Sequence, residues 1–317
     1  MEATTILDVT VIEPRLKHPT IFQKFDELEK GKSLIIHNDH DPKPLYYQLL
    51  AERGNVFTWQ YLEEGPQVWE VQISKLKEGE KELTIGDLVS KDFRKAEVFK
   101  KFGLDFCCGG KKTLTKACKE KGLDMVQIEK ELKAVDETPA ASSHDYNSWD
   151  LGFLAEYILN THHKYVTEAI PVILEYTQKV ARVHGDRHPE AIEIANEFQI
   201  VAAELTSHMA KEEMMLFPYI KKLAAAQKNG TTVEPSEFGT IQNPIKMMEI
   251  EHEEVGNVME NINKLSNSYT PPQDACTTYR LSYAKLKEFE DDLHQHIHLE
   301  NNILFPKAIA LENDLLG

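Results

Sequence analysis

Two histidine–glutamate pairs with identical spacing carry the strongest chemical signal in this chain of 317 residues. His208 is followed four residues later by Glu212, and His296 is followed four residues later by Glu300. Residues four apart lie on the same face of a helix, so each pair can direct an imidazole nitrogen and a carboxylate oxygen toward one point. This combination of donors is typical of a metal site.

Both pairs belong to an internal duplication. Residues 201–218 recur at 289–306, with the order apolar, acid, apolar, His, Glu, apolar preserved and both copies ending in Leu-Phe-Pro. A second part of the repeat relates the stretch around His163 to the stretch around His252. Each of these two histidines lies within an apolar stripe of helical period, so both are predicted to face a core.

Four inward histidines and two inward glutamates from four helices can therefore meet at one place. A single histidine on an apolar face is usually a satisfied core residue, but four at duplicated positions argue against that interpretation. Burying six such groups without compensation would cost several kcal/mol each. A pair of metal ions supplies the compensation, and mixed nitrogen and oxygen donors without thiolate favour iron or manganese over a structural zinc site.

Neighbouring residues are assigned supporting roles. His163 is preferred over His162 as the first-helix ligand, because the face that carries His162 has no counterpart in the repeat. Glu204, Asp292 and Glu251 are predicted to point toward the core and to orient ligands or relay protons, with a partly exposed helix carboxylate as the alternative.

Two further histidines and two prolines flank the candidate site. His294 and His298 lie two residues from His296, on nearly the opposite side of the helix, and are predicted to face solvent. Pro218 and Pro306 are expected to shape the helices beyond the site.

A second chemical feature is the pair of adjacent cysteines Cys107 and Cys108, which are followed by two glycines. Lys111, Lys112 and the start of a predicted helix favour the thiolate form. Such thiols could undergo redox exchange, bind iron or a cluster in transit, or form a disulfide between protomers. Both are therefore candidate catalytic residues.

The elements that must position these residues fall into three segments. Residues 1–78 alternate strand and helix patterns and predict a small α+β domain of order βαβαββ. Residues 80–135 predict a small helical domain, in which Thr84 caps a helix with Asp87 in a capping box. Residues 136–148 are predicted to form a linker. Residues 149–317 have helical periodicity with three breaks, which predicts an all-α four-helix bundle.

The bundle pattern, His…HxxxE…His…HxxxE with Leu-Phe-Pro, resembles the hemerythrin-like domain of the iron-sulfur cluster repair di-iron proteins. The stretch Gly103-Leu104-Asp105-Phe106-Cys107-Cys108-Gly109-Gly110 fully matches the Cys-Cys motif of that family's N-terminal domain, and the resemblance covers about residues 80–312. It implies an oxo- and carboxylate-bridged centre of two non-haem iron ions, with the two glutamates bridging. The ligands that it implies are His163, His208, Glu212, His252, His296 and Glu300.

The same resemblance implies a function in repairing iron-sulfur clusters damaged by nitric oxide or oxidants, with iron donation as the suggested route. Damaged iron-sulfur proteins would then be the partners. Two alternatives use the same centre: a protein that binds or senses nitric oxide or dioxygen, and a nitric oxide reductase. A homodimer is also conceivable. Whether the protein is an enzyme stays open.

The first segment resembles the small TusA/SirA-like sulfur-relay fold. The active Cys-Pro pair of that family would fall near His18-Pro19, and residues 1–78 contain no cysteine, which argues against persulfide transfer. Cys118, in the second segment, is expected to serve packing, and Cys276 has no partner that the sequence identifies.

Charge and composition exclude other classes of protein. The chain has a net charge of −16, of which −15 lies in residues 136–317, a segment with 29 acidic and 14 basic residues. Such acidity argues against binding to nucleic acid phosphates. No apolar run is long enough to span a membrane. Four cysteines, two of them adjacent, fit a reducing cytoplasm better than a disulfide scaffold.

Overall fold

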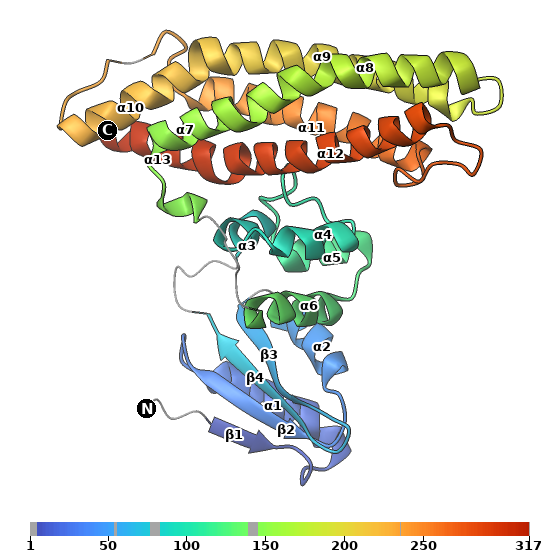
Figure 1. The fold of residues 1–317 in the computed structure, drawn as a ribbon. Helices are drawn as coiled ribbons and strands as arrows, with labels where there is room; N and C mark the ends of the chain where they lie inside the picture. Colours follow the sequence, from blue (N-terminus) through green and yellow to red (C-terminus); the bar gives the residue numbers. More distant parts are fainter. Residues whose placement is uncertain (1–4, 54–55, 77–82, 139–144, 235, 317) are drawn as a thin grey trace. The chain divides into compact units, whose positions relative to one another are not determined.

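The computed structural model describes residues 5–53, 56–76, 83–138, 145–234 and 236–316. The chain divides into two compact units (Figure 1). One unit comprises residues 1–83 and 113–130, and the other comprises residues 84–112 and 131–317. Among the described residues, no helix is both long enough and apolar enough to cross a lipid bilayer.

The first unit contains a four-stranded sheet with the predicted order βαβαββ. Its elements are β1 (Thr5–Asp8), α1 (Pro14–Glu27), β2 (Ser33–Asn38), α2 (Lys43–Arg53), β3 (Phe57–Glu64) and β4 (Trp69–Lys75). The spatial order is β1-β2-β4-β3, with β1 parallel to β2 and the other pairs antiparallel. The small α+β prediction is thereby confirmed.

The core of this unit lies between the sheet and its helices. Alternate residues of β2 are buried, as expected for a strand with one face on a core. Leu34 and Ile36 from β2 pack with Val71 and Ile73 from β4 and with Phe25 from α1. Helix α5 (Leu114–Lys121) and the start of α6 (Met125–Glu137) belong to the same unit.

The start of α6 is tied to α2. The Lys43 ammonium group pairs with the Asp124 carboxylate, and the Tyr46 hydroxyl donates to Met125 Sδ over 2.8 Å. Cys118 on α5 is buried, which agrees with the packing role expected from the sequence.

The second unit is dominated by four long, partly interrupted helices, here called rods. They run side by side (Figure 1). Three of them are interrupted, so the rods are α7 (Leu151–Ile158) with α8 (Lys164–His184), α9 (Glu190–Lys211) with α10 (Phe217–Asn229), α11 (Gln242–Leu265), and α12 (Thr277–Leu299) with α13 (Phe305–Leu316). The breaks between rods follow His184, Asn229 and Leu265, and their number agrees with the three predicted breaks. The four-helix bundle is therefore confirmed.

Each interruption is a five-residue π-helical turn that was not predicted. The turns are η2 (Leu159–His163), η3 (Glu212–Leu216) and η4 (Glu300–Leu304). A π turn widens the helix by one residue and changes the direction of the side chains around it, and such turns are frequent at functional sites. Each of the three contains one candidate ligand: His163 ends η2, and Glu212 and Glu300 begin η3 and η4.

Pro218 and Pro306 occupy the second position of the helices that follow η3 and η4. Proline has no N–H to donate, so it is tolerated at a helix start. Here the two prolines mark where regular α-helix resumes after the π turn. This location agrees with the predicted shaping role.

The remaining part of this unit carries the adjacent cysteines. Helices α3 (Ile85–Lys91) and α4 (Lys95–Lys101) precede a loop of residues 103–112, which we call the cysteine loop. The predicted capping box of Thr84 and Asp87 is present at the start of α3. A short 3₁₀ turn, η1 (Tyr146–Ser148), precedes α7.

The two compact units divide the chain at other residues than the predicted domain limits do. Residues 84–112 cluster with the bundle, whereas residues 113–130 cluster with the sheet, so the separate domain at 80–135 stays a prediction. Helix α6 extends to Glu137, two residues into the predicted linker, and residues 139–144 of that linker lie outside the described residues.

Candidate metal centre

Two overlapping groups of four side chains converge inside the bundle. All six contributing residues are buried, with at most 2 % of any of them exposed. The first group is His163, Glu212, His296 and Glu300, and the second is His208, Glu212, His252 and Glu300. Within each group the donor atoms lie within 4.8 Å of one another. Because both glutamates belong to both groups, the arrangement offers two adjacent cation positions joined by two carboxylates.

The Nε2 atoms of the histidines face the glutamates. In the first group, His163 Nε2 lies 3.4 Å from Glu212 Oε2, and His296 Nε2 lies 3.0 Å from Glu300 Oε1. In the second, His208 Nε2 lies 3.3 Å from Glu212 Oε2, and His252 Nε2 lies 3.2 Å from Glu300 Oε2. Both groups thus have two imidazole nitrogens and two carboxylates.

The outward Nδ1 atoms of three histidines have oxygen partners. His163 Nδ1 lies 2.8 Å from a Glu213 carboxylate oxygen, and His208 Nδ1 lies 2.9 Å from Glu251. A neighbouring lysine, Lys211, also pairs with Glu251. Since a carboxylate can only accept, it favours the tautomer whose Nδ1 carries the proton and whose Nε2 lone pair points inward. Glu251 therefore lies where an orienting acid was predicted.

Asn301 and the bundle interior provide the surroundings of the other two ligands. His252 Nδ1 lies 2.9 Å from the amide oxygen of Asn301. His296 Nδ1 has no hydrogen-bond partner among the described residues, and the ring stacks on His162 with centroids 5.6 Å apart. His252 is thus oriented by a neutral group, whereas the histidines that contact Glu213 and Glu251 are oriented by carboxylates.

The charges in this interior are strongly coupled. Burial disfavours a charged imidazole, but the neighbouring negative carboxylates of Glu212 and Glu300 outweigh burial and raise the pKa of His163 to about 10. The pKa of His208 rises to about 9 against the same burial penalty, mainly through the charge of Glu212. Burial alone would raise the pKa of Glu300, yet the surrounding histidines hold it well below its ordinary value. The pKa of Glu212 is lowered as well. Both carboxylates are therefore ionised, and a positive charge beside them is favourable.

The unpaired oxygen atoms at this place fit a bound cation. Both carboxylate oxygens of Glu212 and Oε2 of Glu300 are buried without a hydrogen-bond partner among the described residues. A buried carboxylate oxygen without a donor is costly, and a metal ion removes that cost. Imidazole and carboxylate donors suit iron or manganese, as in the carboxylate sites of other helical bundles. The six residues therefore fit the implied metal.

His162 lies beside the centre but belongs to neither group. It is buried, and its Nδ1 lies 2.9 Å from Asp292 Oδ1. This arrangement agrees with the preference for His163 over His162 that the sequence indicated. Asp292 therefore contacts His162, which in turn stacks on the candidate ligand His296.

The expectation that Glu204 points toward the core is wrong. Its side chain is exposed on α9. The repeat explains the difference from Asp292, because the residue that corresponds to His162 on the third helix is Glu251. Glu251 is already paired with His208 and Lys211, so Glu204 finds no buried partner and remains in water.

The expectation that His294 and His298 face solvent is also wrong. His298 is only 1 % exposed and His294 is half-buried. The ring of Phe106, from the cysteine loop, lies 5.8 Å from His294 and 5.9 Å from His298. Burial lowers the pKa of both histidines to about 4. The sequence pattern of the helix alone predicts that the face with His294 and His298 is exposed, but the cysteine loop covers this face.

The cysteine loop is organised around Asp105. Its carboxylate accepts hydrogen bonds from the backbone N–H groups of Cys107, Cys108 and Gly109, over 3.0, 3.0 and 2.8 Å. The Cys107 thiol donates to Asp105 Oδ1 over 3.1 Å, and the two sulfur atoms are 3.9 Å apart. Both cysteines are free thiols.

Cys107 is not the activated thiolate that the nearby lysines suggested. Its contact with Cys108, its burial and the charge of Asp105 all raise the pKa of the Cys107 thiol well above its ordinary value. The Lys111 ammonium instead pairs with the Glu249 carboxylate, 2.6 Å away. The expectation therefore fails for Cys107, because the nearest charge to its thiol is negative.

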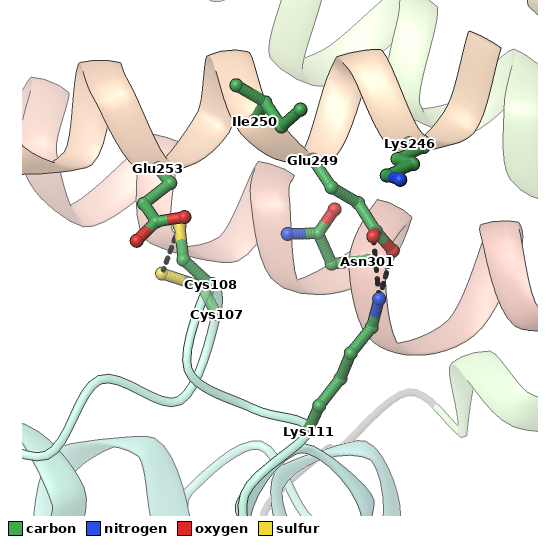
Figure 2. Close-up of a pocket in the computed structure, with 8 residues that line it drawn as sticks. All are labelled: Cys107, Cys108, Lys111, Lys246, Glu249, Ile250, Glu253 and Asn301. Carbon is green, nitrogen blue, oxygen red and sulfur yellow. Dashed lines mark hydrogen bonds and ion pairs between the residues drawn. The ribbon is translucent and has the colours of Figure 1, made fainter. Parts of the chain in front are cut away.

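A cavity of about 290 Å³ lies between the cysteine loop and the bundle (Figure 2). Its wall includes both cysteines, a lysine–glutamate ion pair and Asn301, whose amide also contacts His252. Residues from α11 form the opposite side: Lys246, Glu249, Ile250 and Glu253. One side chain therefore separates the cavity from a candidate ligand.

Asn302 attaches the loop to the π turn η4. Its amide donates to the carbonyl oxygens of Phe106 and Cys107, over 3.1 and 3.3 Å, and its Nδ2 lies 3.1 Å from His298 Nδ1. Sequence reasoning missed Asn301 and Asn302, although their position directly after Glu300 is a signal that could have identified them.

Known relatives match most of the chain. It is 40 % identical over 228 residues to the iron-sulfur cluster repair protein YtfE of Cronobacter sakazakii, covering 72 % of this chain and 96 % of that protein. The protein of that name from Yersinia pseudotuberculosis is 38 % identical over 219 residues, covering 69 % and 93 %. The chain belongs to the iron-sulfur cluster repair protein family.

Family models agree with this membership. The hemerythrin HHE cation-binding domain matches residues 154–308, which contain all six candidate ligands. A domain of unknown function, DUF542, matches residues 81–136 and includes the cysteine loop. An uncharacterized conserved family, DUF2249, matches residues 6–75 in the first unit.

Proposed function

We propose that this member of the repair family is a di-iron protein that repairs iron-sulfur clusters damaged by nitrosative or oxidative stress, by donating iron. The observation that carries the proposal is the pair of overlapping groups in which two histidines and two shared glutamates converge. The names of the relatives support the repair function.

The proposed centre holds two non-haem iron ions, one for each group, with an oxo bridge between them. Glu212 and Glu300 bridge the two positions, since each has donor atoms in both groups. When bound, such a centre supplies iron in a form that an acceptor protein can remove. The residues around it orient the imidazoles: Glu213, Glu251 and Asn301 hold three Nδ1 atoms outward, so that the Nε2 atoms face the carboxylates.

Iron donation is favoured over the other functions by what surrounds the centre. A carrier or sensor of nitric oxide or dioxygen needs only the bundle. In this protein, a loop with two free thiols adjoins the bundle, and a cavity extends from the thiols to Asn301. Thiols are iron ligands, which gives the loop a role in delivery.

The client proteins are iron-sulfur proteins with damaged clusters. Among the described residues the four cysteines form no disulfide, which supports the cytoplasm, where thiols stay reduced, as the compartment. Nitric oxide, dioxygen and a second copy of the chain stay predictions as partners.

Transfer of iron to a client tests the proposal. The reduced, iron-loaded full-length protein is mixed anaerobically with an apo cluster enzyme in the presence of sulfide, and the regained enzyme activity is measured. We expect faster recovery than with the same concentration of free ferrous salt, and no gain above free salt with the Glu300→Ala variant. Recovery no faster than with free salt, together with reversible binding of nitric oxide, would instead favour the sensor.

A further inference from the structure

The cysteine loop contains a second cluster of metal-binding atoms, separate from the centre in the bundle. Asp105, Cys107 and Cys108 each offer one donor atom, and these atoms lie within 4.8 Å of one another. We propose that this cluster is an outer site for a thiophilic divalent cation, which ferrous iron occupies between the bundle and the client. The inference rests on the proposed function for the identity of the ion.

The separation of the two sulfur atoms suits one shared ion. Metal–thiolate bonds of about 2.3 Å at a tetrahedral angle place two sulfur atoms about 3.8 Å apart. The sulfur atoms of Cys107 and Cys108 are 3.9 Å apart. The loop therefore holds its thiols at the distance that bidentate coordination needs, with little rearrangement.

The loop backbone fixes this geometry in advance. The Asp105 carboxylate accepts three backbone N–H groups from the turn that carries both cysteines. Asn302 holds the carbonyl groups of Phe106 and Cys107 against η4. A Cβ atom on Gly109 would lie only 2.7 Å from the Asp105 carbonyl oxygen, so glycine is required for the close turn.

The protons and charges also suit a cation. The Cys107 thiol proton lies between sulfur and Asp105 Oδ1, where a cation would replace it. Binding of one M²⁺ ion by two thiols forms two metal–sulfur bonds and releases two protons to solvent. In the cavity wall, the two lysines are matched by Glu249 and Glu253. The charge of the outer site is therefore set by Asp105 and the two thiolates, and it is negative when both thiols are deprotonated.

The cavity connects the outer site to the bundle centre. Figure 2 shows both cysteines on one side of it and the Asn301 amide on another. Asn301 is only 4 % exposed, and its oxygen lies 2.9 Å from His252 Nδ1. The His252 side of the bundle centre therefore lies next to the cavity that contains the cysteines. Glu253 lines the same space and is placed to contribute a fourth donor atom, which would be the second oxygen of the site.

Cobalt(II) is a suitable probe, because thiolate-to-cobalt charge transfer absorbs in the near ultraviolet and the bundle centre contains no thiol. Reduced, metal-free, full-length protein is titrated anaerobically with Co²⁺. We expect the charge-transfer band in the wild type and in the Glu300→Ala variant. We expect a Cys108→Ser variant to lose the band, or to need at least about tenfold more Co²⁺ for it, as loss of a ligand should exceed loss of its supporting contact.

A Cys118→Ser/Cys276→Ser double variant is the matched control, and it should keep the band. The half-buried Cys108 is the first choice for substitution, with Asp105→Asn as a second variant if the serine variant fails to fold. Absence of the band in the wild type, or its persistence unchanged in Cys108→Ser, would overturn the outer site. Neither result touches the bundle centre, whose failure is detected separately as loss of bound iron.

Discussion

Asn301 accepts, at its amide oxygen 2.9 Å away, the hydrogen bond of His252 Nδ1, and the same side chain lines the cavity that contains both cysteines. The two other candidate-ligand histidines with an Nδ1 partner use the carboxylates of Glu213 and Glu251. A neutral partner makes imidazole a weaker donor to a metal than a carboxylate partner does. The ion position that faces the cavity is therefore held by one histidine with a carboxylate partner and one with a neutral partner, whereas His296 at the other position has no Nδ1 partner among the described residues.

Replacement of Asn301 by alanine tests this relationship. Asn301→Ala leaves the His252 ring free to rotate, and we expect iron affinity at one of the two positions to fall about 10–100-fold. Iron release to a ferrous chelator, followed by absorbance, should become biphasic or faster. The control is Asn261→Ala, an exposed asparagine of α11 that bonds Glu197. Identical release from both variants would show that Asn301 does not orient the ligand.

Loss of a proposed ligand should remove iron from the bundle. We expect anaerobically prepared wild-type protein to contain about two irons per chain, as in other carboxylate-bridged bundles. His208→Ala and Glu300→Ala should lose most of it, as measured by elemental analysis. His188→Ala is a control, because His188 lies between α8 and α9 and pairs with Glu190 and Asp274. Full retention in both ligand variants contradicts the assignment.

The buried histidines under the cysteine loop predict a dependence of stability on pH. Burial lowers the pKa of His294 and His298 to about 4, whereas an unfolded histidine has a pKa near 6.5. The stability from their neutral burial is thus fully present above pH 6.5, and it is lost as the pH falls toward 4. At pH 5 the loss is on the order of 2 kcal/mol for each histidine.

Denaturant unfolding at pH 7 and pH 5 measures this loss. A His298→Gln variant should lose less of its free energy of unfolding between the two pH values than the wild type, by about 2 kcal/mol. His18→Gln, at a partly exposed histidine of the first unit, is the control. Equal losses in all three proteins would show that His298 is not held neutral in the fold.

The contact between the cysteine loop and η4 leaves no space for a methyl group. A Cβ atom at Gly110 would lie 2.4 Å from Asn302 Oδ1 and 2.5 Å from the Phe106 carbonyl oxygen. We expect Gly110→Ala to cost about 1–3 kcal/mol of unfolding free energy and to speed alkylation of the buried Cys107. Gly152→Ala, whose Cβ would come no closer than 3.1 Å to a neighbour, is the matched control. Unchanged alkylation would mean that the loop is not held by this contact.

The repeat made the candidate ligands predictable, because His208 with Glu212 and His296 with Glu300 have a spacing that only a helix brings to one point. The same reasoning could not find the three π turns, since the apolar period continues through them and a one-residue widening changes it little. Glu204 was misplaced for a related reason. Its spacing is right, but its exposure depends on which residue the facing helix presents.

His294 and His298 show a different limit. Helical periodicity places a side chain on a face, and it says nothing about what covers that face from another part of the chain. The covering loop brings Phe106 onto these histidines from nearly 190 positions earlier in the sequence. The Cys107 thiol was misjudged likewise, because Lys111 is close in sequence but turns to Glu249.

Three consecutive residues of η4 face three different parts of the unit. Glu300 belongs to the metal groups, Asn301 holds His252 at the cavity, and Asn302 holds the cysteine loop. Only two peptide bonds therefore separate Glu300, a candidate metal ligand, from Asn302, which holds the cysteine loop in position. By thermodynamic reciprocity, a client that binds the loop more tightly when iron has left must, on docking, weaken iron binding by the same factor. Recognition of the damaged protein and release of the ion then become a single event, without a signal that must cross the bundle.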